Sequence, residues 1–169
     1  FIGIEPAIKP AALQTKTGKI GVLATEGTLK SELFLSTSEQ FRDSLELVKI
    51  KGQNLVRLIE AGDIGKTKPL LVEYLTPMID AGVDNIVLGC THYPFLIPLI
   101  NEIIPDHIVI IDSGKAVAKQ TQVILNSKDF LNNDSCSEKV FYTNKNLHIF
   151  ESFLKGINLH PKIISFRDF

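Results

Sequence analysis

A thiol, a hydroxyl and an imidazole follow one another at Cys90, Thr91 and His92, inside the segment LGCTHYP. An apolar run precedes them, and Pro94 stands where the first residue of a helix would lie. A helix N-terminus and a nearby imidazole both favour the thiolate, so the segment predicts a proton-moving cysteine with a lowered pKa. Thr91 and the helix N–H groups would hold a substrate carboxylate. The alternative is a small buried cysteine without chemistry, and spacing alone leaves both open.

The elements that must position this segment are short apolar runs alternating with longer segments of helical period. The runs lie at 20–24, 45–50, 85–89, 107–111, 139–143 and 162–165, and the helical segments at 28–41, 53–61, 67–81, 94–103, 114–126 and 146–156. Apolar runs without polar alternation are typical of strands buried on both faces of a parallel sheet. The pattern predicts a doubly wound, mostly parallel α/β sheet with helices on both faces. Cys90 then follows a buried strand, at the edge where ligands bind in such sheets.

Two units are predicted along the chain. The strand ending at 111 meets a turn at Asp112-Ser113-Gly114, and the polar segment 126–137 marks a later shift in composition. We interpret residues 1–112 as a complete α/β domain that carries Cys90. Residues 113–169 are interpreted as the C-terminal part of a second, similar α/β domain. Because the chain starts at Phe1 without a methionine, we expect it to be part of a longer protein.

Composition excludes several classes of partner. The 169 residues carry 18 basic and 19 acidic side chains, a net charge of −1, so no basic surface for nucleic acid or anionic membranes is expected. No apolar run approaches the roughly 18 residues of a membrane span. Two cysteines make no disulfide framework and favour the reducing cytoplasm. The histidines show no spacing typical of a metal site, so no metal is expected.

Three segments resemble glutamate racemases, of the aspartate/glutamate racemase family. They are IVLGCTHYPFL at 86–96, GIEPAIKPA at 3–11 and IGVLATEGTLKS at 20–31, and the resemblance covers essentially the whole chain. Aspartate and hydantoin racemases share a related cysteine loop, so a racemase of that type stays an alternative. The extended CTHYP form, together with EPAIKPA and ATEGT, favours the glutamate enzyme.

The resemblance implies cofactor-independent, two-thiol racemisation of L- and D-glutamate at the α-carbon, supplying D-glutamate for peptidoglycan. Inverting a stereocentre requires one group to remove a proton from one face while another delivers a proton to the other face. Cys90 matches the family's second thiol, which takes the proton from the L-enantiomer. The resemblance implies glutamate as the small-molecule partner, and a homodimer is common in the family.

Other residues match family positions near the substrate. His92 matches the histidine that assists the thiol, and Thr91 matches a residue that binds the carboxylate or ammonium group. Thr25 and Thr28 lie in another strand-to-helix loop that faces the substrate, although Thr28 is also interpreted as a helix N-cap. Glu60 matches an acidic residue near the active site.

The chain also departs from the family. The N-terminal Asp-Ser motif and the first catalytic cysteine, followed by Asn-Thr, are absent from it. Cys136 matches nothing catalytic and is interpreted as an incidental loop residue. Two other functions are weighed: a small-carboxylate binding module without catalysis, and a thiol hydrolase with a Cys90–His92 pair. The hydrolase is disfavoured because the pair lacks a third group that orients the imidazole.

Overall fold

The computed structural model describes residues 2–3, 7–132, 138–157, 159, 161 and 163–168. Its central feature is a four-stranded sheet in the order β2-β1-β3-β4, in which every pairing is parallel. The strands are β1 (Lys19–Ala24), β2 (Glu46–Lys51), β3 (Asn85–Gly89) and β4 (Val109–Ile111). The predicted α/β class and parallel sheet are confirmed.

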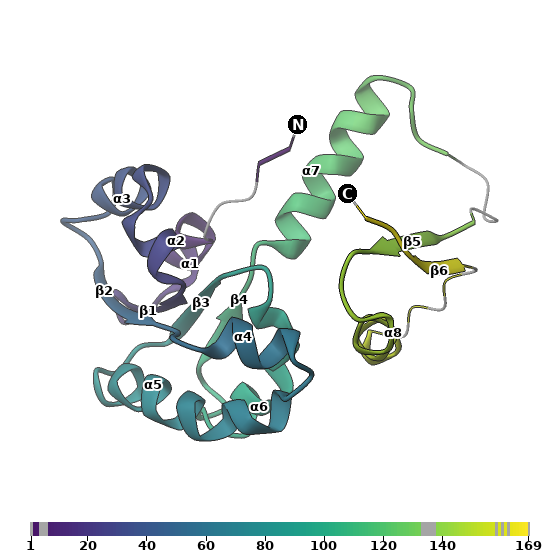
Figure 1. Cartoon of the computed structure of the whole chain (residues 1–169). Coiled ribbons are helices and arrows are strands. Elements are labelled where there is room, and N and C mark those ends of the chain that lie inside the picture. The colour runs from purple at the N-terminus through teal and green to yellow at the C-terminus, as the bar shows by residue number, and fades with distance from the viewer. Residues whose placement is uncertain are drawn as a thin grey trace.

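Helices cover both faces of this sheet (Figure 1). On one face lie α1 (Ile8–Gln14), α2 (Glu26–Lys30) and α3 (Glu32–Glu39). On the other lie α4 (Leu55–Glu60), α5 (Lys68–Asp80) and α6 (Ile97–Asn101), with the 3₁₀ helices η1 (Ile64–Thr67) and η2 (Tyr93–Leu96). Each face therefore has its own apolar core.

The two central strands supply both cores because successive side chains on a strand point to opposite faces. On β3, Ile86 and Leu88 join the core under α4–α6, while Val87 joins the core under α1 and α3. The edge strands differ: β2 and β4 are only partly buried. The runs at 45–50 and 107–111 pack against both cores, but they are buried less completely than predicted because an edge strand has a neighbouring strand on one side only.

Several predicted helices have different boundaries. The helix predicted at 28–41 is divided at Ser31, whose hydroxyl accepts a hydrogen bond from the Phe34 N–H at 3.2 Å and so begins α3. The helix predicted at 94–103 is the four-residue η2 followed by the five-residue α6. No helix was predicted at α1, where Pro10 occupies the first turn and its missing N–H costs no hydrogen bond.

The C-terminal segment has its own small sheet. After α7 (Gly114–Ser127) come β5 (Val140–Thr143), α8 (Leu147–Gly156) and β6 (Ile163–Phe166). β5 and β6 pair in parallel, apart from the first sheet (Figure 1). α8 returns to the first unit, where Phe153 stacks on Phe95 with ring centroids 4.6 Å apart. The assignment of 1–112 and 113–169 to two domains stays a prediction.

Two findings concern regions outside the sheets. Cys136 lies outside the described residues, so its predicted place in a surface loop is not observed. Among the helices of the described ranges, none is long and apolar enough to cross a membrane.

Candidate active site

A cleft of about 490 Å³ opens where β1, β3 and β4 end. In a parallel sheet the carboxyl ends of the strands meet along one edge, and loops from neighbouring strands form a crevice there. Cys90 and Thr91 leave β3 on one side, and Thr28 approaches from α2. The lining residues are Gly27, Thr28, Ser31, Leu33, Leu88, Gly89, Cys90, Thr91, Pro94, Asp112, Ser113 and Gly114.

Behind the thiol, three side chains form a continuous polar line. The Cys90 Sγ lies 3.9 Å from the His92 Nδ1, and the His92 Nε2 lies 3.1 Å from a Glu60 carboxylate oxygen. The imidazole exposes 34% of its side chain and the carboxylate 52%, so this line runs from the cleft to solvent. The structure thus brings together the three residues that were predicted as catalytic, although Glu60 is 32 positions from His92.

The electrostatics of the thiol differ from the prediction. Burial raises the pKa of the Cys90 thiol above its usual value, and hydrogen bonds from the backbone N–H groups of His92 and Tyr93 only partly oppose this. The predicted lowering of this pKa is therefore wrong. Its assumed causes were a helix N-terminus near Pro94 and the nearby imidazole, but the burial of the thiol has the larger effect.

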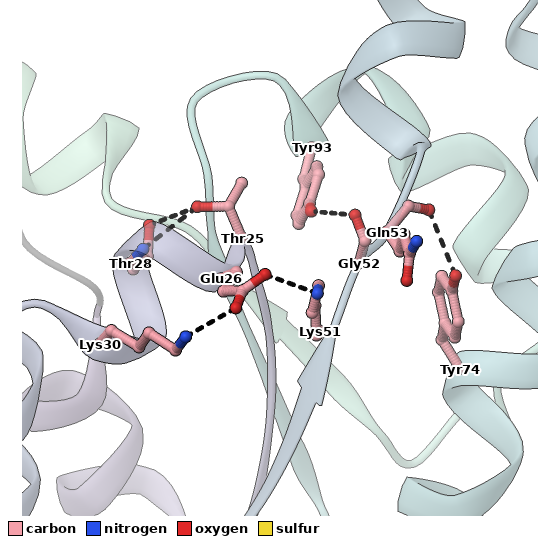
Figure 2. Close-up of polar contacts among 9 residues, drawn as sticks. All are labelled: Thr25, Glu26, Thr28, Lys30, Lys51, Gly52, Gln53, Tyr74 and Tyr93. Carbon is pink, nitrogen blue, oxygen red and sulfur yellow. Dashed lines mark hydrogen bonds and ion pairs between the residues drawn. The ribbon is translucent and has the colours of Figure 1, made fainter.

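Thr25 and Thr28 occupy one turn, with their hydroxyl oxygens 2.9 Å apart. Thr25 is the N-cap of α2, because its hydroxyl accepts a hydrogen bond from the Thr28 N–H at 3.2 Å (Figure 2). The interpretation of Thr28 as the N-cap is therefore wrong by three residues. Thr28 lines the cleft with Cys90, whereas Thr25 lines a neighbouring, more open groove together with Glu60.

The turn that carries these threonines is held to the sheet by Glu26. Its carboxylate lies 2.7 Å from the Lys30 Nζ and 2.6 Å from the Lys51 Nζ at the end of β2 (Figure 2). Hydrogen bonds from Lys30 and then Lys51, with their positive charges, lower the pKa of Glu26 to about 2. The carboxylate is therefore ionised at neutral pH and joins α2 to β2.

A third wall of the cleft was not predicted from the sequence. Asp112, Ser113 and Gly114 line it from the end of β4, yet they were used only to mark a domain boundary. The same reasoning that placed Cys90 after a strand applies to this Asp-Ser-Gly turn. Within the described ranges, no group of three His, Cys, Asp or Glu side chains is placed to hold a metal ion.

Comparison with known sequences assigns the chain to a protein family. Residues 1–121 match the family described as Asp/Glu/Hydantoin racemase. The chain belongs to that family. It is 43% identical over 145 residues to a glutamate racemase of Pseudomonas putida strain KT2440, and 41% identical over 145 residues to one of Pseudomonas paraeruginosa strain PA7. These alignments cover 85% of the chain but only 55% of each relative. The chain therefore spans about half the length of these relatives.

Solved structures agree with the family fold. The chain is similar to the Escherichia coli glutamate racemase, solved in complex with L-glutamate and the activator UDP-MurNAc-Ala, with a TM-score of 0.78 and 27% identity. That match covers 97% of this chain and 63% of the E. coli chain. A glutamate racemase isoform from Bacillus anthracis matches with a TM-score of 0.74 and 25% identity, covering 94% and 62% of the two chains.

Membership of the racemase family also bears on the thiol hydrolase. That alternative was disfavoured because Cys90 and His92 lacked a third group. In the structure Glu60 supplies that group, 3.1 Å from the His92 Nε2. The expectation that a third group is lacking is therefore wrong, and the hydrolase is disfavoured by the family to which the chain belongs.

Proposed function

We propose that this chain is part of a glutamate racemase, and that Cys90 is one of two thiols that move a proton at the α-carbon of glutamate. The observation that carries the proposal is the Cys90–His92–Glu60 line ending in the cleft. Support comes from relatives named glutamate racemase and from the E. coli enzyme, whose complex contains L-glutamate. Within the family, this support favours glutamate over the aspartate and hydantoin alternatives.

The proton transfers follow from the geometry around Cys90. With its raised pKa, the resting thiol holds its proton and is ready to donate it to a carbanion formed from D-glutamate. In the opposite direction Cys90 must be a thiolate. The His92 Nδ1 accepts the thiol proton, and the Glu60 carboxylate stabilises the resulting imidazolium through Nε2. The thiolate then removes the α-proton of L-glutamate.

Substrate binding and the second acid complete the proposal. Thr91 and Thr28, which line the cleft beside Cys90, hold the polar groups of glutamate. The second thiol, on the opposite face of the α-carbon, comes from a part of the protein that this chain does not include. D-glutamate would be used for peptidoglycan, and a reducing cytoplasm would keep Cys90 reduced. The homodimer stays a prediction.

The decisive experiment is racemisation of L- and D-glutamate by the full-length protein, followed by circular dichroism. Cys90→Ser should abolish turnover in both directions, because each direction needs an acid and a base on opposite faces. Cys136→Ser is the matched control and should leave the rates close to wild type. Equal losses in the two variants would contradict the assignment of Cys90. Glutamate binding without any turnover by the wild-type protein would favour the binding module instead.

A second experiment concerns residues 1–169 alone, which we expect to be inactive as a racemase. One thiol exchanges a proton on one face of the α-carbon and cannot deliver one to the other. In D₂O, deuterium incorporation into L-glutamate without formation of D-glutamate would report that half-reaction. Activity after addition of the missing N-terminal fragment would support the proposal, and robust racemisation by this chain alone would overturn it.

A further inference from the structure

A buried tyrosine lies directly beside the predicted catalytic histidine. The Tyr93 ring is fully buried, and its hydroxyl donates a hydrogen bond to the Gly52 carbonyl at 3.0 Å (Figure 2). A ring that only filled the core would need no hydroxyl, and a buried hydroxyl is costly unless it is paired. The pairing of Tyr93 with a backbone carbonyl 41 residues away therefore fixes the distance between two loops.

Gly52 has no side chain, and the Tyr93 ring occupies the space that a side chain would take. A Cβ added at Gly52 would collide with the Tyr93 hydroxyl and would lie 2.9 Å from the Leu55 Cδ1. The Gly52 N–H in turn donates to the Ala24 carbonyl at 2.9 Å, so the acceptor is itself attached to the end of β1. Only glycine fits at position 52, so the Tyr93 ring packs directly against the backbone of this turn.

The two ends of this hydrogen bond belong to the two halves of the catalytic line. Tyr93 directly follows His92, and its backbone N–H donates a hydrogen bond to the Cys90 carbonyl at 3.2 Å. Gly52 stands three residues before α4, which begins at Leu55 and ends at Glu60. One buried hydrogen bond therefore joins the loop of the thiol and imidazole to the turn from which the Glu60 helix departs.

We propose that Tyr93 is a positioning residue: its hydrogen bond to Gly52 sets the separation of His92 and Glu60 and so fixes which imidazole nitrogen faces the Cys90 thiol. This inference rests on the proposed racemase function. Glu60 is half exposed and water competes for its carboxylate, so the 3.1 Å contact to Nε2 persists only while the two loops are held together. The buried hydrogen bond between Tyr93 and Gly52 holds the two loops together on the side away from solvent.

The test is a double-mutant cycle on the full-length protein with Tyr93→Phe and Glu60→Ala. Phenylalanine keeps the ring and removes the donor. We expect Tyr93→Phe to lower kcat about tenfold in both directions with KM unchanged, as for residues that orient a catalytic group. In the Glu60→Ala background the same substitution should change kcat less than about twofold, because the contact it protects is already absent.

Tyr74→Phe is the matched control. Its hydroxyl donates to the carbonyl of Gln53, the next residue along the same turn, at 3.2 Å and on the exposed side (Figure 2). We expect Tyr74→Phe to leave kcat unchanged both in the wild-type protein and in the Glu60→Ala background. An equal loss from Tyr93→Phe with and without Glu60 would show that Tyr93 only stabilises the fold, and this would overturn the inference, as would a wild-type kcat for Tyr93→Phe.

A readout independent of turnover separates this inference from the proposed function. The ¹⁵N chemical shifts of the His92 ring report its tautomer. In wild type we expect Nε2–H, donated to Glu60, and in Tyr93→Phe a mixture of tautomers. An unchanged tautomer in Tyr93→Phe would contradict the positioning role even if the protein racemises glutamate. If Tyr93→Phe changes the His92 tautomer but the protein does not racemise glutamate, the positioning role of Tyr93 is supported and only the proposed reaction is contradicted.

Discussion

Gly89 and Ala24 meet where β3 and β1 end, and a Cβ added at Gly89 would lie 2.7 Å from the Ala24 Cβ. Gly89 lines the cleft directly before Cys90. Gly89→Ala should therefore push the central strands apart and lower the free energy of unfolding by about 1–3 kcal/mol, as overpacking does. Urea denaturation of the protein measures this loss.

The control for that substitution is Gly156→Ala at the end of α8, where an added Cβ meets nothing within 4 Å. Here alanine should raise stability by a few tenths to about 1 kcal/mol, because it has the better helix propensity. A loss at Gly156 equal to that at Gly89 would show that the close approach of the strands is not the cause.

The pH dependence of Cys90 follows from its burial. Because burial raises its pKa, less thiolate is present at a given pH than in a free cysteine. The rate of iodoacetamide alkylation, plotted against pH, should have its midpoint above that of glutathione measured alongside. Cys136→Ser should be used to remove the second thiol. A midpoint below that of glutathione would restore the lowered pKa that the sequence alone predicted.

His92 and Glu60 should differ in the size of their effects. His92→Asn removes the group that we propose exchanges the proton, so kcat should fall roughly 10²–10⁴-fold. Glu60→Ala should cost roughly 10–100-fold, as orienting partners do. Glu60→Gln should lie closer to wild type, because its amide oxygen still accepts a hydrogen bond from the Nε2–H. Equal rates for the Gln and Ala variants would mean that charge, not orientation, is what Glu60 contributes.

Asp84, next to the amino end of β3, holds the loop before β1. Its carboxylate accepts hydrogen bonds from the Thr15 hydroxyl at 2.7 Å and from the backbone N–H groups of Lys16 and Thr17 at 2.6 and 3.0 Å. Burial opposes ionisation, but these bonds and one from Asn85 outweigh it and hold the pKa of Asp84 below its usual range. Asp84→Asn should lower the free energy of unfolding by about 2 kcal/mol at pH 7.

The sign of the pH dependence at Asp84 follows from the lowered pKa. The carboxylate stabilises the fold fully above the usual carboxyl pKa, and this contribution is lost as pH falls through that value towards the lower pKa of the folded state. The difference between wild type and Asp84→Asn should therefore shrink when unfolding is measured at acid pH. Glu46→Gln removes an exposed ion pair with Lys19 and should change stability by less than about 0.5 kcal/mol.

Local pattern was enough to predict the strands and the place of Cys90. The run at 85–89 is apolar and β-branched because β3 is central, and that alone put the thiol at a strand end. Glu60 was found only through the family resemblance, since no local pattern links a helix-end carboxylate to a histidine 32 residues away. The raised pKa of Cys90 and the hydrogen bond from Tyr93 to Gly52 both depend on burial. Burial arises only when segments distant in the sequence pack together, so a local pattern does not predict it.

The stack of Phe95 on Phe153 has a consequence for the order in which the chain folds during synthesis. Phe95 stands five residues after Cys90, and its partner ring lies on α8, near the other end of the chain. The four strands of the first sheet are complete at Ile111, but Phe95 has no packing partner from α8 until residue 153 has left the ribosome. The packing of α8 against the segment after Cys90 is therefore completed well after the first sheet.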